Sequence, residues 1–152
     1  MIVRNSEPHL GKDNCTAEAI AVFASLFIRR FLSDREFYFS LDSLDNVDRI
    51  LGRFAGGYPD STAQEKMKLE AGCYLLEVAR MNYGGVYYWW DERHMPVLVC
   101  GVPRNRVAIA TFDKVLQRIG NGAADNIFFF FSGFVESMER AKTESGIDVV
   151  YV

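Results

Sequence analysis

The residue types that most often do chemistry in proteins, cysteine and histidine, are few in this chain and far apart. There are three cysteines and two histidines, and the histidines are His9 and His94. Cys73 and His94 could pair as a thiol nucleophile and its base. However, Cys73 falls in a segment that has the pattern of a buried helix, whereas a catalytic thiolate needs an accessible, electropositive setting. We therefore interpret both histidines as solvated loop residues.

Short motifs that carry phosphate, metal or acyl chemistry are also missing from the sequence. It has no Gly-rich phosphate loop, no HExxH, no nucleophile elbow and no paired CxxC. We expect a protein that is not an enzyme, with no catalytic residues, no metal and no cofactor.

Three aspartates, Asp42, Asp45 and Asp48, form the most acidic cluster of the chain. Their spacing is not that of a calcium loop, which alternates ligands around a central glycine. Acids are favourable at a helix N-terminus, and Asp45 precedes Arg49 by four residues, the spacing of an ordinary exposed ion pair. Two interpretations stay open: a solvated helix face, or an acidic docking surface that speeds association with a basic partner.

Glu77 is the one carboxylate set among apolar neighbours, between Leu75-Leu76 and Val78-Ala79. A buried carboxylate must find a partner or remain protonated. The first interpretation is a structural salt bridge or hydrogen bond to another element. The alternative makes Glu77 the polar contact of an apolar pocket between helix and sheet.

Aromatic residues supply two further candidates for binding. In the expected strand Val86–Trp90, alternation sends Tyr87 and Trp89 to one face and Tyr88 and Trp90 to the other. If helices cover only one face, the other presents Tyr and Trp, which anchor protein interfaces. Phe129 lies outside the buried stripe of its expected helix, so it invites a partner or a dimer.

Composition excludes several classes of protein. The chain has 152 residues, 49% of them hydrophobic, and a formal net charge of −3, so it has no electrostatic footprint for nucleic acid. The first apolar run, 19–28, is too short to span a bilayer. Cys15, Cys73 and Cys100 are odd in number and widely spaced, which favours free thiols in a reducing cytoplasm.

Periodicity and turn residues divide the chain into five helices and four strands, with no repeat or linker that would mark a second domain. The helices are expected at 13–32, 43–54, 61–83, 111–119 and 125–143, and the strands at 86–90, 96–100, 106–110 and 147–152, with a short extended piece at 37–41. This order, ααα-βββ-αα-β, predicts a single α+β domain over residues 1–152 with an antiparallel sheet covered on one face by helices.

The third expected helix has two apolar sides, which predicts a central position between other elements. Gly72 lies in its middle at a cost of about 1 kcal/mol relative to alanine. We expect another element to cross closely at this glycine.

The segment from Leu69 to Gly85, LEAGCYLLEVARMNYGG, is followed by an aromatic strand. It resembles an uncharacterised family of small bacterial α+β proteins whose helix carries a G-x-Y-L-x-E-V core. The resemblance covers residues 41–135, implies a fold but no activity, and gives Glu77 no role. As a small acidic protein of this kind, the chain also looks like the immunity proteins that neutralise bacterial toxins.

These observations favour a non-catalytic, cytoplasmic protein-binding module of the immunity type, which neutralises a toxin or effector by direct binding. The expected partner-binding residues are Asp45, Asp48, Tyr87, Trp89 and Phe129. The alternative is a small-molecule-binding or weakly enzymatic domain with its pocket near Glu77. A homodimer built on Phe129 is a third hypothesis.

Overall fold

The computed structural model describes residues 10–11, 14–32, 39–54 and 60–152. The helices are α1 (Asn14–Phe31), α2 (Ser43–Gly52), α3 (Ser61–Tyr83), α4 (Phe112–Asn121) and α5 (Ile127–Ala141). The strands are β1 (Leu10–Gly11), β2 (Val86–Trp90), β3 (Met95–Cys100), β4 (Arg106–Ile109) and β5 (Asp148–Tyr151). Single 3₁₀ turns at Asp91–Arg93 and Gly122–Asp125 follow β2 and α4. The predicted order of elements is confirmed, and the two-residue β1 is added to it.

The sheet has the strand order β1-β2-β3-β4-β5 and is mixed rather than antiparallel throughout. The first three pairings are antiparallel, whereas β5 runs parallel to β4, with Arg106 opposite Asp148 and Ile109 opposite Tyr151. The reason is the connection: α4 and α5 lie between β4 and β5 and form the long crossover that parallel neighbours require. The class α+β is confirmed, and the expectation of a purely antiparallel sheet is corrected.

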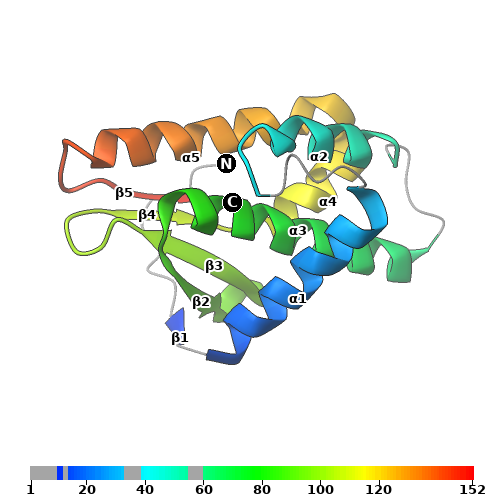
Figure 1. Cartoon of the computed structure of the whole chain (residues 1–152), viewed down its shortest axis with the longest axis horizontal. Coiled ribbons are helices and arrows are strands. Elements are labelled where there is room, and N and C mark those ends of the chain that lie inside the picture. The colour runs from blue at the N-terminus through cyan, green and yellow to red at the C-terminus, as the bar shows by residue number, and fades with distance from the viewer. Residues whose placement is uncertain (1–9, 12–13, 33–38, 55–59) are drawn as a thin grey trace.

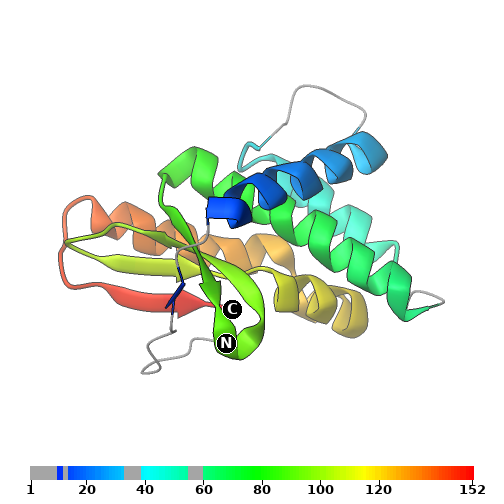
Figure 2. The same cartoon turned by 90° about the horizontal axis from the view of Figure 1, so that it is seen from below.

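Helices α3 and α5 cover one face of the sheet (Figure 1). On that face Tyr87, Leu98, Ile109 and Tyr151 lie side by side across four strands. The Tyr87 hydroxyl reaches α3, and the Tyr151 hydroxyl lies 2.6 Å from Ser137 Oγ of α5. Seen from below, the strands lie in front of α5 (Figure 2).

The opposite face of the sheet does not expose a set of aromatic side chains to solvent. Trp90, Val97, Ala108 and Val150 on that face are all buried. The guanidinium of Arg93 stacks over the Trp90 ring at 4.9 Å. Only Val86, at the start of β2, is exposed among the β2 residues of this face, while Tyr88 is half-buried.

Helix α3 is the centre of the helical layer. Every residue from Glu70 to Ala79 is buried, with α1 packed along one side of the helix and α4 along another. The sequence prediction of a sandwiched helix is therefore confirmed. Its N-cap is Asp60, whose carboxylate accepts a hydrogen bond from the Ala63 N–H at 2.7 Å, and the helix begins at Ser61 as expected.

The close crossing expected at Gly72 is present. A Cβ at this position would lie 2.5 Å from Cδ1 of Phe112, the first residue of α4. The neighbouring Thr111 hydroxyl donates a 2.7 Å hydrogen bond to the Gly72 carbonyl. Glycine is needed here because the α4 start is seated directly on the α3 backbone.

Several expectations fall partly or wholly outside this description. His9, the side chain of Cys15 and residues 37–38 of the expected extended piece lie outside the described residues. Residues 39–41, which complete that piece, contain turns and no strand. None of the helices in the described part of the chain is both long enough and apolar enough to cross a membrane.

Candidate functional site

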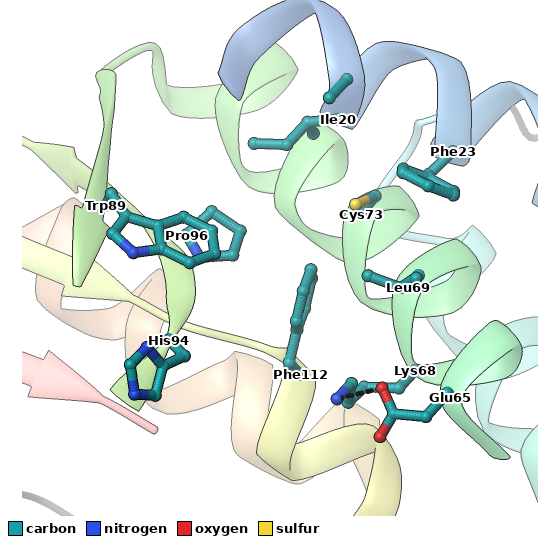
Figure 3. Close-up of a pocket in the computed structure, with 11 residues that line it drawn as sticks. Ile20, Phe23, Glu65, Lys68, Leu69, Cys73, Trp89, His94, Pro96 and Phe112 are labelled. Carbon is teal, nitrogen blue, oxygen red and sulfur yellow. Dashed lines mark ion pairs between the residues drawn. The ribbon is translucent and has the colours of Figure 1, made fainter. Parts of the chain in front are cut away.

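A pocket of about 570 Å³ opens between the N-terminal half of α1, the first half of α3, the β2–β3 hairpin and the start of α4 (Figure 3). Most of its lining is apolar or aromatic. The residues around it are Ala19, Ile20, Phe23, Glu65, Lys68, Leu69, Cys73, Trp89, His94, Pro96 and Phe112.

The backbone explains why these side chains meet. Trp89 and Pro96 are direct partners across β2 and β3, so both point to the helix-covered face. Phe112 stands between them and α3 because Thr111 and Gly72 fix the start of α4. Ile20 and Phe23, one turn apart on α1, complete the wall opposite the hairpin.

Polar groups gather on one side of this pocket. The Lys68 ammonium lies 2.6 Å from Oε2 of Glu65, one turn earlier on α3. The His94 side chain is exposed at the tight turn between β2 and β3, where its backbone is left-handed with φ 50°. Cys73 lies deeper: burial and the nearby Glu77 raise the pKa of its thiol to about 12, so this sulfur is a neutral thiol at physiological pH.

Glu77, one turn after Cys73 on α3, does not line this pocket and instead forms an ion pair with Arg80. Its two carboxylate oxygens accept hydrogen bonds from Nε and Nη2 of Arg80, each at 2.8 Å, and Oε1 also accepts one from the Tyr87 hydroxyl at 2.7 Å. Burial raises the pKa of Glu77, but the hydrogen bonds from Arg80 and Tyr87 outweigh it and hold that pKa below its usual 4.5. Glu77 is thus a charged structural partner that borders a separate, smaller hollow of about 420 Å³.

Asp48 likewise has an internal role. Its carboxylate accepts hydrogen bonds from Nε of Arg118 at 2.8 Å, from the Asn126 amide at 3.0 Å and from the Ile127 N–H at 2.9 Å. It joins α2 to α4 and bonds the first N–H of α5, a helix whose N-cap is Asn126. Asp48 is therefore held by bonds within the fold, and its expected role in an acidic docking surface stays a prediction.

Tyr87 and Trp89 also lie elsewhere than expected. They face the helices rather than open solvent, because β2 uses this side of the sheet for packing. Tyr87 is buried and its hydroxyl is taken by Glu77, so it is no surface anchor; burial also raises its pKa well above the usual value. Trp89 is half-buried and forms a wall of the pocket.

Phe129 is exposed as expected, and a second phenylalanine that the sequence analysis missed stands beside it. The exposed fractions are 80% for Phe129 and 52% for Phe128. We call these two side chains at the start of α5 the Phe128–Phe129 surface. The stripe of Ile127, Phe131, Phe134 and Met138 is buried as predicted. Four consecutive phenylalanines, 128 to 131, cannot all lie on one buried stripe of a helix, and this run could have indicated the second exposed ring.

Asp45 remains exposed on the neighbouring helix α2. The expected pair with Arg49 is not formed, since the Arg49 guanidinium donates to the Asn46 side chain at 3.1 Å instead. Of the predicted partner-binding residues, Asp45 and Phe129 are thus on the surface, Trp89 is in the pocket, and Asp48 and Tyr87 are internal.

Within the described ranges, no group of three or more histidine, cysteine, aspartate or glutamate side chains could hold a metal ion. Comparison of the chain with protein-family models, with curated proteins and with solved structures finds no match.

Proposed function

We propose that this chain is a non-catalytic protein-binding module that holds its partner through the Phe128–Phe129 surface. The observation that carries the proposal is the exposure of two adjacent phenylalanines, of which Phe129 is 80% exposed. Full burial of a phenylalanine contributes about 1.5 to 3 kcal/mol, so a partner that covers both rings gains a substantial anchor. Aromatic anchors of this kind carry most of the energy of an interface of about 1,600 Å².

Charge supports a basic partner. Asp45 is exposed on α2, which packs against α5, and it has no ion-pair partner in the part of the chain that the structure describes. The whole chain has a net charge of −3. Such a charge steers a basic protein toward the surface and raises the association rate more than the final affinity.

The concrete form of the proposal is an immunity-type inhibitor that binds a toxin or effector in the cytoplasm. The type of protein that the sequence resembles supports it, as do the free thiols of Cys73 and Cys100. Burial raises the pKa of the Cys100 thiol to about 12, so that group too is unreactive.

Co-purification from the cells that encode the chain tests this proposal. The tagged wild-type protein is compared with Phe128→Ser/Phe129→Ser and with the control Val102→Ser, which alters another exposed apolar residue in the turn after β3. We expect one partner at a fixed ratio with the wild type and with the control, and loss of that partner with the double variant. Equal recovery with all three proteins would place the contact elsewhere.

Sedimentation velocity separates a foreign partner from a second copy of the chain. A monomer over the full concentration range agrees with the proposed inhibitor. A dimer that dissociates in the Phe128→Ser/Phe129→Ser variant would replace it with the self-association hypothesis, because the same two rings would then be buried between identical chains.

A further inference from the structure

The pocket beneath α1 has the size and the walls of a small-molecule site that is separate from the Phe128–Phe129 surface. Its volume of about 570 Å³ lies within the range of roughly 300 to 1,000 Å³ that ligand pockets occupy. Five elements contribute to it: α1, α3, β2, β3 and α4. Such a site is held by the fold itself rather than by one loop.

The walls of the pocket favour a flat occupant. Trp89 from β2, Phe112 from α4 and Phe23 from α1 surround the space with aromatic rings, as Figure 3 shows. Aromatic pairs attract each other beyond what the area that they bury accounts for. A ring system inserted between these side chains gains both terms.

The lining carries no net formal charge when His94 is neutral. Among the described lining residues, the cation Lys68 is neutralised by Glu65 at 2.6 Å, and the imidazole of His94 stands at the rim. An anion would have to compete with Glu65 for Lys68, and a cation would have to compete with Lys68 for Glu65. The site therefore fits an uncharged molecule whose few polar atoms face Lys68 and His94.

The sulfur in the wall sets the mode of binding. Cys73 lies deeper among apolar residues and is protonated at neutral pH, so it packs against an occupant without attacking it.

We propose that the pocket between α1, α3 and the β2–β3 hairpin binds a flat, uncharged, mainly aromatic small molecule, with its apolar rings between Trp89 and Phe112 and its polar edge toward Lys68 and His94. This assignment moves the ligand away from Glu77, which is already bonded to Arg80 and Tyr87.

The test uses N-phenyl-1-naphthylamine, an uncharged aromatic probe that fluoresces in apolar surroundings. Ala19 is exposed on the pocket rim, so Ala19→Phe fills the opening without removing a core side chain. Ala21 is exposed on the same helix but borders the hollow next to Glu77, so Ala21→Phe is the matched control. We expect saturable binding to the wild type, a loss of about tenfold in affinity with Ala19→Phe and no change with Ala21→Phe.

Two results would overturn the proposal: no saturable fluorescence increase with the wild type, or unchanged affinity in Ala19→Phe. Loss of binding in Ala21→Phe alone would do the same, because it would place the probe beside Glu77. Trp89→Ala is a second variant that enlarges the pocket rather than filling it, and we expect a loss of about tenfold there too. Circular dichroism of each variant shows whether it has kept its fold.

Discussion

Two carboxylates, the half-buried Asp48 and the buried Glu77, resemble each other in chemistry and differ in what they connect. Each accepts two hydrogen bonds from one arginine, and Asp48 accepts two more from other groups whereas Glu77 accepts one more. Asp48 joins α2 to Arg118 of α4 and to the first N–H of α5. Glu77 bonds Arg80 one turn later on its own helix and Tyr87 on the strand that follows.

The arginines differ in their access to water. The Arg118 side chain is 8% exposed and that of Arg80 is 39% exposed. If its carboxylate is removed, Arg80 can turn into solvent, whereas Arg118 stays buried without its counter-charge. The stability lost on removing either carboxylate is therefore expected to depend mainly on whether its arginine partner can reach solvent.

The largest effect is expected from Asp48→Ala. It leaves Arg118 unpaired between α2 and α4 and removes the acceptor of the first N–H of α5, so we expect the free energy of unfolding to fall by about 3 to 5 kcal/mol. Urea unfolding followed by circular dichroism measures it. The control Asp45→Ala, on the exposed face of the same helix, should stay within about 0.5 kcal/mol of the wild type. Similar losses in both variants would show that the exposure of the partner does not decide the cost.

A smaller effect is expected from Glu77→Gln. The amide oxygen still accepts a hydrogen bond from Tyr87, and Arg80 turns toward water, so we expect a loss of about 1 to 2 kcal/mol. The same urea experiment on Arg80→Ala and on the double variant gives the coupling energy of the pair. A loss as large as that of Asp48→Ala would show that the exposure of the partner arginine does not set the cost.

The smallest difference is expected in the response to acid. Burial raises the pKa of Asp48, but the bonds from Arg118 and the Ile127 N–H prevail and hold it below its usual 3.8; Glu77 likewise lies below 4.5. Both groups therefore contribute stability above these values that is lost as the pH falls through their folded pKa. We expect Asp48→Asn to lower the slope of stability against pH below about pH 4.5 by at most about 1.4 kcal/mol per pH unit. A slope identical to that of the wild type would mean that folding does not lower the pKa of Asp48.

Much of the fold could be predicted because its signals are local. The stripe of α2, the aromatic strand β2 and the glycine at position 72 each act over a few residues, and the structure contains all three features. The parallel pairing of β5 was missed because four residues of alternating pattern do not reveal the direction of their neighbour.

The candidate site was harder to predict for the same reason. The bond between Arg80 and Glu77 spans three residues and was within reach of spacing arguments, whereas the bond between Arg118 and Asp48 spans 70. Sequence alone assigned Tyr87 and Trp89 to a shared face but could not say that helices cover it. The pocket needed Ile20, Leu69, Trp89 and Phe112 to converge from four elements, which no local pattern encodes.

The late arrival of β5 has a consequence for how the chain folds. Arg106 of β4 pairs with Asp148 of β5, 42 residues further on, so this edge of β4 is unpaired until β5 docks. Val107 to Ile109 on that edge are apolar, and an unpaired apolar edge can add a strand from another molecule. Closing this long loop is expected to be slow, so the β4 edge is exposed to other molecules for longer during folding. This exposure ends when β5 docks and Asp148 pairs with Arg106.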